Sequence, residues 1–242
     1  MIVVLAIDAL ELELVERFNC ANLKQAHYGR TDISEFSEPR TMVLWSSFMT
    51  GKNKEQEVLA RGDKEMWNIK WPVQDTFFSR FKDPLVLDLP GFSYDLAVHE
   101  RSRVLLKKFF DAKTLEEKEK VRKAYNQDAL EHHRKIKEEF LKALEEDHDL
   151  LLGYFSAADV IGHLNFGNTM LMRMVYKDLD EIAQKVREKG CPLIVLSDHG
   201  MRGVGMFGDH SEHGFWSTSS KNLGTPKITD FADILTDLKE QD

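Results

Sequence analysis

The sequence has few cysteines and no long apolar segment. Its 242 residues contain only Cys20 and Cys191, which cannot build a disulfide framework. This cysteine usage predicts a reducing, cytoplasmic compartment. No apolar run reaches the roughly 18 residues of a membrane span. The apolar start, residues 1–7, lacks a basic region and a small-residue cleavage site, so we expect neither a membrane anchor nor a signal peptide.

Positive charge is also scarce. The chain has 33 Lys and Arg against 41 Asp and Glu, a net charge of −8. This balance excludes a protein that binds an extended nucleic-acid backbone, because such binding uses a basic face. It still allows a small anionic substrate, since bound metal ions can reverse the local field. The length fits one domain with a substantial core.

Short apolar runs alternate with longer amphipathic segments. The runs that predict buried strands are residues 2–7, 150–155 and 192–196, with 85–87 as a further candidate. The segments that predict helices are residues 114–146, 168–189 and 230–240. This alternation predicts an α/β fold, with a mostly parallel central sheet and helices on both faces.

We expect a single domain over residues 1–242, with a charged helical insertion at about 92–147. The insertion carries His132 and His133 among Lys and Glu residues. Their charged neighbours favour a solvated helix face, so we expect both histidines at the surface.

An aspartate follows each of the three strongest predicted strands. Asp8, Asp159 and Asp198 therefore fall near the carboxyl ends of strands, where ligands bind in open α/β sheets. His163 lies four residues after Asp159, so on a helix the two side chains share one face. They are either a ligand pair for a metal ion or a local hydrogen bond.

More histidines accompany these aspartates. His199 directly follows Asp198, and His210 and His213 lie shortly afterwards. Asp8 and Asp198 could each belong to a turn or a helix cap. The combination of three aspartates and several histidines instead predicts a site for two metal ions, Zn²⁺ or alternatively Mn²⁺.

Two metal ions about 3.5–4 Å apart suit phosphoryl transfer, which then needs a nucleophile. The segment 39–51 offers four hydroxyl groups, those of Thr41, Ser46, Ser47 and Thr50. Thr41 precedes a predicted helix and could be no more than its N-cap. Position alone does not choose among the four.

The ordered motifs resemble those of the alkaline phosphatase superfamily, and most of all its type I phosphodiesterase/nucleotide pyrophosphatase branch. The motifs are Asp8, Pro39-Arg40-Thr41 through Thr50-Gly51, Asp159-x-x-Gly162-His163, Asp198-His199-Gly200-Met201 and Gly208-x-His210. They span nearly the whole chain, and their order is more specific than any one of them.

The resemblance implies a role for each residue. The residues implied around one metal ion are Asp8, Thr41, Asp198 and His199. Those implied around the other are Asp159, His163 and His210, with His213 as the rival for the last place. Thr41 matches the family nucleophile. By proximity, Arg40 or an amide near Thr41 could hold a phosphate oxygen.

The function implied is hydrolysis of phosphate monoesters or diesters through a phosphothreonine intermediate. The alternatives are a phosphomutase of the same superfamily and a non-catalytic metal-binding protein on this fold. The expected partner is a small phosphate ester, with no extended nucleic acid and no membrane. The substrate and the oligomeric state stay open.

Overall fold

The computed structural model describes residues 1–239, which form an α/β protein around a six-stranded sheet. The strand order is β2-β8-β5-β1-β4-β3. The strands are β1 (Ile2–Ile7), β2 (His27–Asp32), β3 (Pro84–Leu87), β4 (Leu150–Phe155), β5 (Leu193–Ser197) and β8 (His213–Thr218). A separate two-stranded sheet pairs β6 (Met201–Val204) with β7 (Phe207–His210).

The four apolar runs of the sequence form the parallel part of the sheet. β1 pairs in parallel with β4 and β5, and β4 pairs in parallel with β3. β8 runs antiparallel to β5 and to β2. The predicted strands and the mostly parallel sheet are therefore confirmed.

The α-helices are α1 (Leu12–Arg17), α2 (Ala21–Lys24), α3 (Thr41–Thr50), α4 (Glu55–Leu59), α5 (Gly62–Glu65), α6 (Leu96–Asp111), α7 (Leu115–Ala143), α8 (Ala157–Asn165), α9 (Thr169–Glu188) and α10 (Phe231–Lys239). The 3₁₀ turns are η1 (Met66–Asn68), η2 (Val73–Asp75), η3 (Phe77–Arg80) and η4 (Ile228–Asp230). The expected helix at 230–240 is thus observed up to Lys239, and Glu240 lies outside the described residues.

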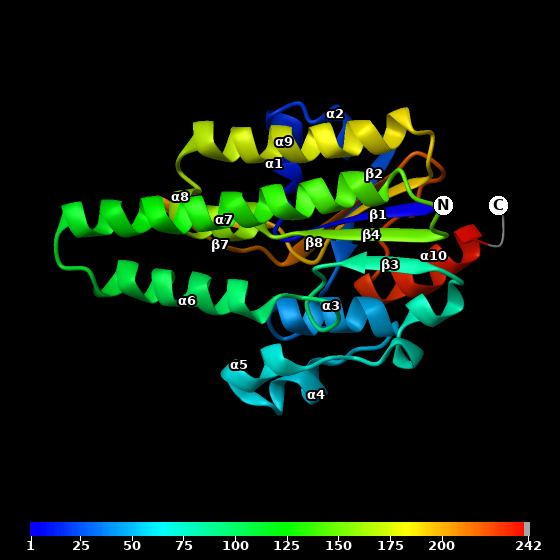
Figure 1. Ribbon diagram of the computed structural model, residues 1–242, viewed down its shortest axis with the longest axis horizontal. Helices are drawn as coiled ribbons and strands as arrows, with labels where there is room; N and C mark the ends of the chain where they lie inside the picture. The colour runs from blue at the N-terminus through cyan, green and yellow to red at the C-terminus, as the bar shows by residue number, and fades with distance from the viewer. Residues whose placement is uncertain (240–242) are drawn as a thin grey trace.

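Helices cover both faces of the sheet. In Figure 1, α7 and α9 lie on one side of the strands, and α3 and α10 lie on the other. Successive β1 residues alternate between the two apolar cores, with Val4 in one and Val3 and Leu5 in the other. Each face buries apolar side chains, which explains why the strand sequences are continuously apolar.

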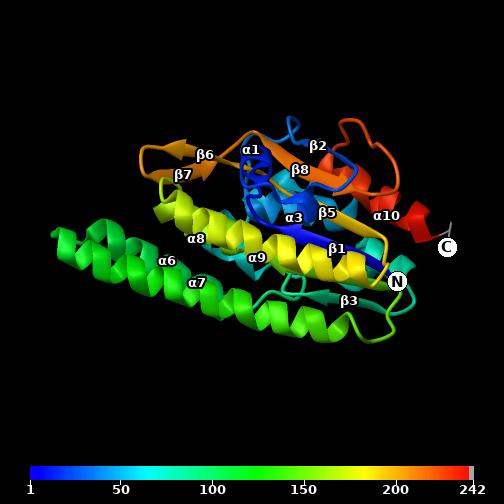
Figure 2. The same ribbon diagram turned by 90° about the horizontal axis from the view of Figure 1, so that it is seen from above.

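A long antiparallel helix pair extends beyond the sheet (Figures 1 and 2). It consists of α6 and α7, which lie inside the segment 92–147 that the sequence marks as helical. The Thr114 hydroxyl and the Glu117 carboxylate cap the first turn of α7 reciprocally, as a capping box does. That the segment is an insertion into a single domain stays a prediction.

The expectation that His132 and His133 lie at the surface is wrong. Both are buried where α7 packs on the body of the protein. His132 Nε2 lies 2.5 Å from Asp88 Oδ2, and His133 Nε2 lies 2.7 Å from Asp178 Oδ2. The charged residues next to these histidines in the sequence lie on the exposed face of α7. They therefore do not indicate whether the histidines themselves are buried.

The described residues include both cysteines and all the long helices. Cys20 and Cys191 are both free thiols, and Cys20 is buried. Within residues 1–239, no helix has both the length and the apolar character needed to span a membrane. The cytoplasmic location stays a prediction.

Candidate metal centre and active site

The first group of candidate metal ligands forms where β1 and β5 end side by side. Asp8 directly follows β1, and Asp198 and His199 directly follow β5. His199 Nε2 lies 3.4 Å from Asp8 Oδ1 and 3.4 Å from Asp198 Oδ2. All three side chains are almost fully buried. Parallel pairing of the two strands thus brings together residues about 190 positions apart, as expected from the sequence.

The second ligand group lies beside the first and comes from α8 and β7. Asp159 is in the first turn of α8 and not directly at the end of β4. Its Oδ1 lies 3.2 Å from His163 Nε2 and 3.4 Å from His210 Nε2. The helical spacing predicted for Asp159 and His163 is therefore confirmed.

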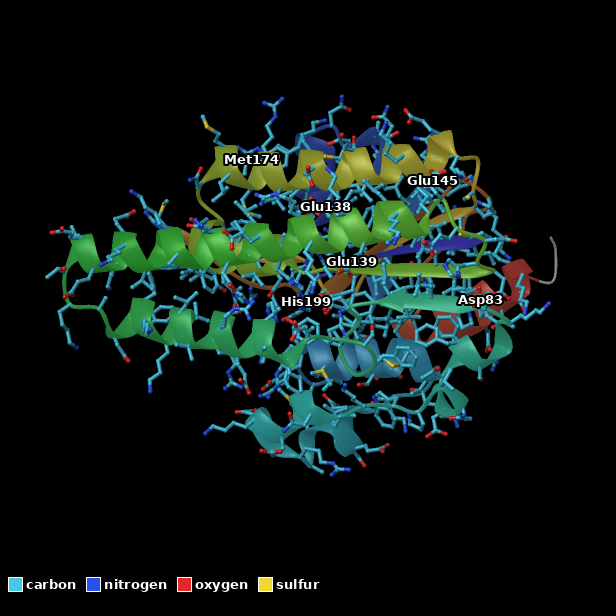
Figure 3. All side chains as sticks on the ribbon, viewed as in Figure 1. Asp83, Glu138, Glu139, Glu145, Met174 and His199 are labelled. Atoms are coloured by element: carbon cyan, nitrogen blue, oxygen red, sulfur yellow. The ribbon has the colours of Figure 1, made fainter. Side chains whose placement is uncertain are left out.

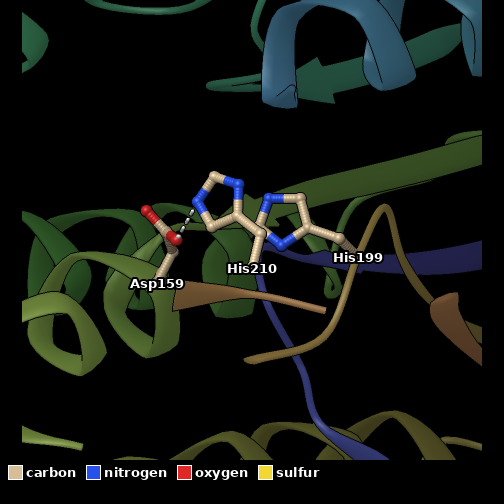
Figure 4. A group of neighbouring side chains, drawn as sticks. All are labelled: Asp159, His199 and His210. Carbon is tan, nitrogen blue, oxygen red and sulfur yellow. Dashed lines mark ion pairs between the residues drawn. The ribbon is translucent and has the colours of Figure 1, made fainter. Parts of the chain in front are cut away.

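The two groups are in direct contact through one histidine from each. The imidazole rings of His199 and His210 stack with their centroids 3.8 Å apart, as Figure 4 shows together with Asp159. In Figure 3, His199 lies inside the molecule, whereas Glu138 and Met174 project from outer helices. We call the six residues the strand-end group: Asp8, Asp159, His163, Asp198, His199 and His210.

Many polar atoms of the strand-end group are buried without a hydrogen bond. These atoms are Asp8 Oδ1 and both oxygens of Asp198, together with Asp159 Oδ1 and His210 Nε2, whose contacts within the group are ion pairs that lack hydrogen-bond geometry. Buried polar groups are normally paired, because leaving one unpaired costs roughly 1–3 kcal/mol. Carboxylate oxygens and imidazole nitrogens are the ligands that Zn²⁺ takes in proteins. The donor set therefore fits divalent cations.

The pKa values in this group reflect crowded negative charge. Burial raises the pKa of Asp8 well above its usual value, and Asp198 and Asp159 add to the rise. Burial also raises the pKa of Asp198. Burial opposes ionisation of Asp159 as well, but His163 and His210 hold its pKa well below the usual value. The carboxylates of the first group therefore lack the positively charged neighbours that Asp159 has, and a cation would take their place.

The two stacked histidines differ in their affinity for protons. Burial lowers the pKa of His199 to about 3, and His210 adds to the fall. Burial also disfavours the charged form of His210, but Asp159 outweighs it and raises the pKa of His210 to about 9. His199 is therefore a neutral imidazole at neutral pH, which is the form that binds metal ions.

Thr41 approaches this group from α3, which covers one face of the sheet (Figure 1). It is the first residue of α3, and its Oγ1 lies 3.5 Å from His199 Nε2. The N-cap residue of α3 is Arg40, and the Thr41 hydroxyl makes no capping bond. The reading of Thr41 as a simple N-cap is therefore wrong.

The other hydroxyl groups of this segment are engaged elsewhere. Ser47 and Thr50 donate to carbonyl groups one turn earlier in α3. Ser46 accepts a hydrogen bond from Trp71 Nε1 at 2.9 Å. Of the four hydroxyls, only that of Thr41 contacts the strand-end group in the described chain.

Two further predicted residues point away from the strand-end group. Arg40 forms ion pairs with Glu38 and Asp63, at 2.7 Å and 2.6 Å. His213 contacts Glu11 instead, with 3.9 Å between His213 Nε2 and Glu11 Oε1. Between the two rivals for the last ligand, the fold brings His210 to Asp159.

Sequence reasoning missed Tyr154, which lies in the apolar strand β4. Its hydroxyl donates a hydrogen bond to Asp8 Oδ2, which leaves Oδ1 facing the other ligands. A tyrosine in an apolar strand looks like a core residue, so no sequence signal marks this contact.

A cavity of about 180 Å³ opens beside Thr41 and Asp159. Most of its wall comes from α6, α7 and η1, and it includes Trp67, Tyr94 and His99. Trp67 and His99 stack with their centroids 3.6 Å apart. Burial lowers the pKa of His99 to about 4, so this part of the wall is uncharged and aromatic.

The α/β fold and the family match place this chain in the alkaline phosphatase superfamily. The family model described as type I phosphodiesterase / nucleotide pyrophosphatase matches residues 66–218, more than half of the chain. The protein therefore belongs to the type I phosphodiesterase/nucleotide pyrophosphatase family. The matched part contains Asp159, His163, Asp198 and His199, and also His210. No curated protein sequence is significantly similar to this chain.

Solved structures with a similar fold share little sequence with this chain. The PsFucS1 sulfatase from Pseudoalteromonas sp. has a TM-score of 0.51 and 14% identity, over 98% of this chain and 67% of the sulfatase. Murine ectonucleotide pyrophosphatase/phosphodiesterase 5 has a TM-score of 0.46 and 14% identity, and the human protein 0.46 and 16%. The match covers 84% of this chain but 58% of either mammalian chain, so the protein spans little more than half their length.

Proposed function

We propose that this protein hydrolyses phosphate monoesters or diesters through a phosphothreonine intermediate on Thr41, with two divalent cations bound by the strand-end group. Zn²⁺ is the cation that the mixed Asp and His ligands favour, with Mn²⁺ as the alternative. The observation that carries the proposal is a cluster of buried carboxylate and imidazole atoms without hydrogen bonds, next to His199, whose Nε2 lies 3.5 Å from the Thr41 hydroxyl.

The ligands divide into two sets. Asp8, Asp198 and His199 would hold one cation beside Thr41. Asp159, His163 and His210 would hold the other. When bound, the cations neutralise phosphate oxygens and lower the pKa of coordinated hydroxyl groups.

Thr41 is suited to attack phosphorus because it begins α3. The first backbone amides of a helix have no intrahelical acceptor, and the helix dipole places partial positive charge there. These amides can hold the non-bridging oxygens of a phosphoryl group on Thr41. His199 Nδ1 lies 3.0 Å from the Gly200 carbonyl oxygen, so Nε2 is the nitrogen left to hold a cation, and it lies 3.5 Å from the Thr41 hydroxyl.

The cavity beside Thr41 is the place for the leaving group. Its aromatic wall, with Trp67, Tyr94 and His99, favours an alcohol with an apolar or aromatic body. This wall supports aryl or nucleoside esters over small sugar phosphates. Murine ectonucleotide pyrophosphatase/phosphodiesterase 5 has been solved with AMP as an inactive variant, so AMP belongs in the substrate tests.

The test compares Thr41→Ala with Thr41→Ser on a panel of esters. The panel holds p-nitrophenyl phosphate, bis-p-nitrophenyl phosphate, AMP and a hexose phosphate, each with Zn²⁺ or Mn²⁺. Thr41→Ala should lower kcat/KM at least about a thousandfold, because it removes the nucleophile, whereas Thr41→Ser should retain measurable turnover. In quenched wild-type reactions, mass spectrometry should find a phosphate on Thr41 from a monoester, and a phosphoryl group that keeps its remaining ester from a diester.

Each alternative has its own signature in the same panel. Isomerisation of the hexose phosphate without phosphate release would identify a mutase. No turnover of any ester with any metal would leave the non-catalytic alternative. Undiminished hydrolysis by Thr41→Ala would contradict the proposed nucleophile.

A further inference from the structure

A second group of ligand-type side chains lies outside the strand-end group. Glu11 is the N-cap residue of α1, Glu13 lies in the first turn of α1, and His213 begins β8. One ligand atom from each lies within 4.8 Å of the other two. We call these three residues the outer group. None of them has a role in the proposed hydrolysis.

The centre of the outer group is a buried carboxylate with one oxygen unpaired. The Glu11 side chain is only 6% exposed. Its Oε2 accepts hydrogen bonds from the Met201 amide at 3.0 Å and from Ser211 Oγ at 3.1 Å. Its Oε1 has no hydrogen-bond donor and faces His213 Nε2 at 3.9 Å. This oxygen is therefore a ligand atom that protein donors leave free.

The surroundings of this oxygen are those of a cation site. Glu13 places a second carboxylate against Glu11, and burial together with this neighbour raises the pKa of Glu11 to about 8. Burial lowers the pKa of His213, so its imidazole is neutral at neutral pH. His213 Nδ1 lies 3.3 Å from the Gly214 carbonyl oxygen, which leaves Nε2 for a ligand. Arg30 pairs with Glu13, but both are half-exposed, so this pair is a weak competitor.

We propose that Glu11, Glu13 and His213 bind a third divalent transition-metal ion, Zn²⁺ in the first place. Two carboxylates and one imidazole suit Zn²⁺, whereas Mg²⁺ and Ca²⁺ prefer oxygen ligands alone. Ligands at about 2.1 Å from one ion lie at most about 4.2 Å apart. Glu11 and His213 already meet this limit, and the exposed Glu13 can move to meet it.

The third ion would brace the loop that carries two catalytic ligands. The outer group is tied to this loop by the Met201 amide on Glu11 and by the Gly200 amide, which donates to the His213 carbonyl oxygen at 2.7 Å. A side chain at Gly200 would collide with Glu11 and Ser211, so the loop packs directly against the outer group. Asp198 and His199 immediately precede this contact. The ion would act by positioning and not by touching the substrate.

Metal counting by elemental analysis tests the third site. The wild type and each variant are stripped with EDTA, reloaded with Zn²⁺ and freed of excess metal. Glu13→Gln and His213→Ala should each hold one equivalent less than the wild type. Glu16→Gln makes the same charge change on the same helix, where Glu16 pairs with Lys24, and should hold as much as the wild type.

The design separates the third site from the strand-end group. His210→Ala removes a strand-end ligand, so its deficit reports the proposed catalytic metals, while the deficit of Glu13→Gln reports the outer group alone. Glu13 is exposed, so Glu13→Gln should fold, and circular dichroism checks this. An equal count in the wild type, Glu13→Gln and His213→Ala would overturn the proposal, since Glu11 and Glu13 would then share a proton instead.

Discussion

Two buried regions of this protein pair aspartate with histidine, but they differ in whether the pairing is complete. Beside α7, both oxygens of Asp88, which follows β3, accept hydrogen bonds: one from His132 of α7 and one from the Asp95 amide. In the strand-end group, neither oxygen of Asp198 accepts one. The same residue types therefore build a satisfied structural contact in one region and an unsatisfied ligand set in the other.

The difference teaches how to read buried polar residues. A buried carboxylate with all its bonds made contributes to stability, whereas one left unpaired destabilises the metal-free protein. The free-energy cost of burying Asp198 must be offset either by a bound group or by stabilising contacts elsewhere in the fold. Completeness of pairing thus separates Asp198 from Asp88 more sharply than burial does, since both carboxylates are buried.

The largest expected effect follows from neutralising the unpaired carboxylate. Asp198→Asn should lower kcat/KM about a thousandfold, because a catalytic cation supplies several kcal/mol and each 1.4 kcal/mol is tenfold. The same change should raise the free energy of unfolding of the EDTA-treated protein by about 1 kcal/mol, because burying a neutral amide costs less than burying a carboxyl group whose ionised form burial already disfavours. Urea denaturation with and without EDTA measures this. If the metal-free variant were less stable than the metal-free wild type, Asp198 would not be an unsatisfied residue, and its contrast with Asp88 would be wrong.

At the Asp88–His132 contact, we expect the opposite effect on stability and none on activity. Asp88→Asn should lower the free energy of unfolding by about 1–2 kcal/mol, because it weakens a charge-assisted bond to His132. Asparagine also suits the left-handed backbone at this position, where φ is 59°. The bound metal should be unchanged by elemental analysis. A lost equivalent would mean that the two regions are not separate.

The smallest effect concerns pH and the second α7 contact. Burial opposes ionisation of Asp178, but His133 and Lys137 outweigh it and lower its pKa to about 2. Since an unfolded aspartate has a pKa of about 3.9, this stabilisation is present above pH 4 and is lost as the pH falls towards 2. Asp178→Asn should remove that part of the acid-induced loss. Thermal melts of both proteins between pH 2 and 5 measure it, and parallel curves would contradict the assignment.

The sequence predicts most of the fold and the strand-end group for a common physical reason. Parallel strands are continuously apolar, and their carboxyl ends meet at one edge, so Asp8 and Asp198 could be brought together without a structure. The helical spacing of Asp159 and His163 likewise follows from a local repeat. These features depend on short stretches of sequence.

Contacts between distant segments could not be predicted in the same way. His132 reaches Asp88 across 44 positions, and Glu11 reaches the Met201 amide across 190. No local sequence pattern around His132 or Glu11 predicts which distant residue each one contacts. Tyr154 and Glu11 were therefore missed, and the burial of His132 was wrongly predicted.

The central claim is that the unpaired atoms of the strand-end group bind two cations. Anomalous diffraction at the zinc edge from crystals grown or soaked with Zn²⁺ tests it most directly. We predict one peak among Asp8, Asp198 and His199 and a second among Asp159, His163 and His210. The absence of any peak in the strand-end group of zinc-saturated crystals would contradict the account.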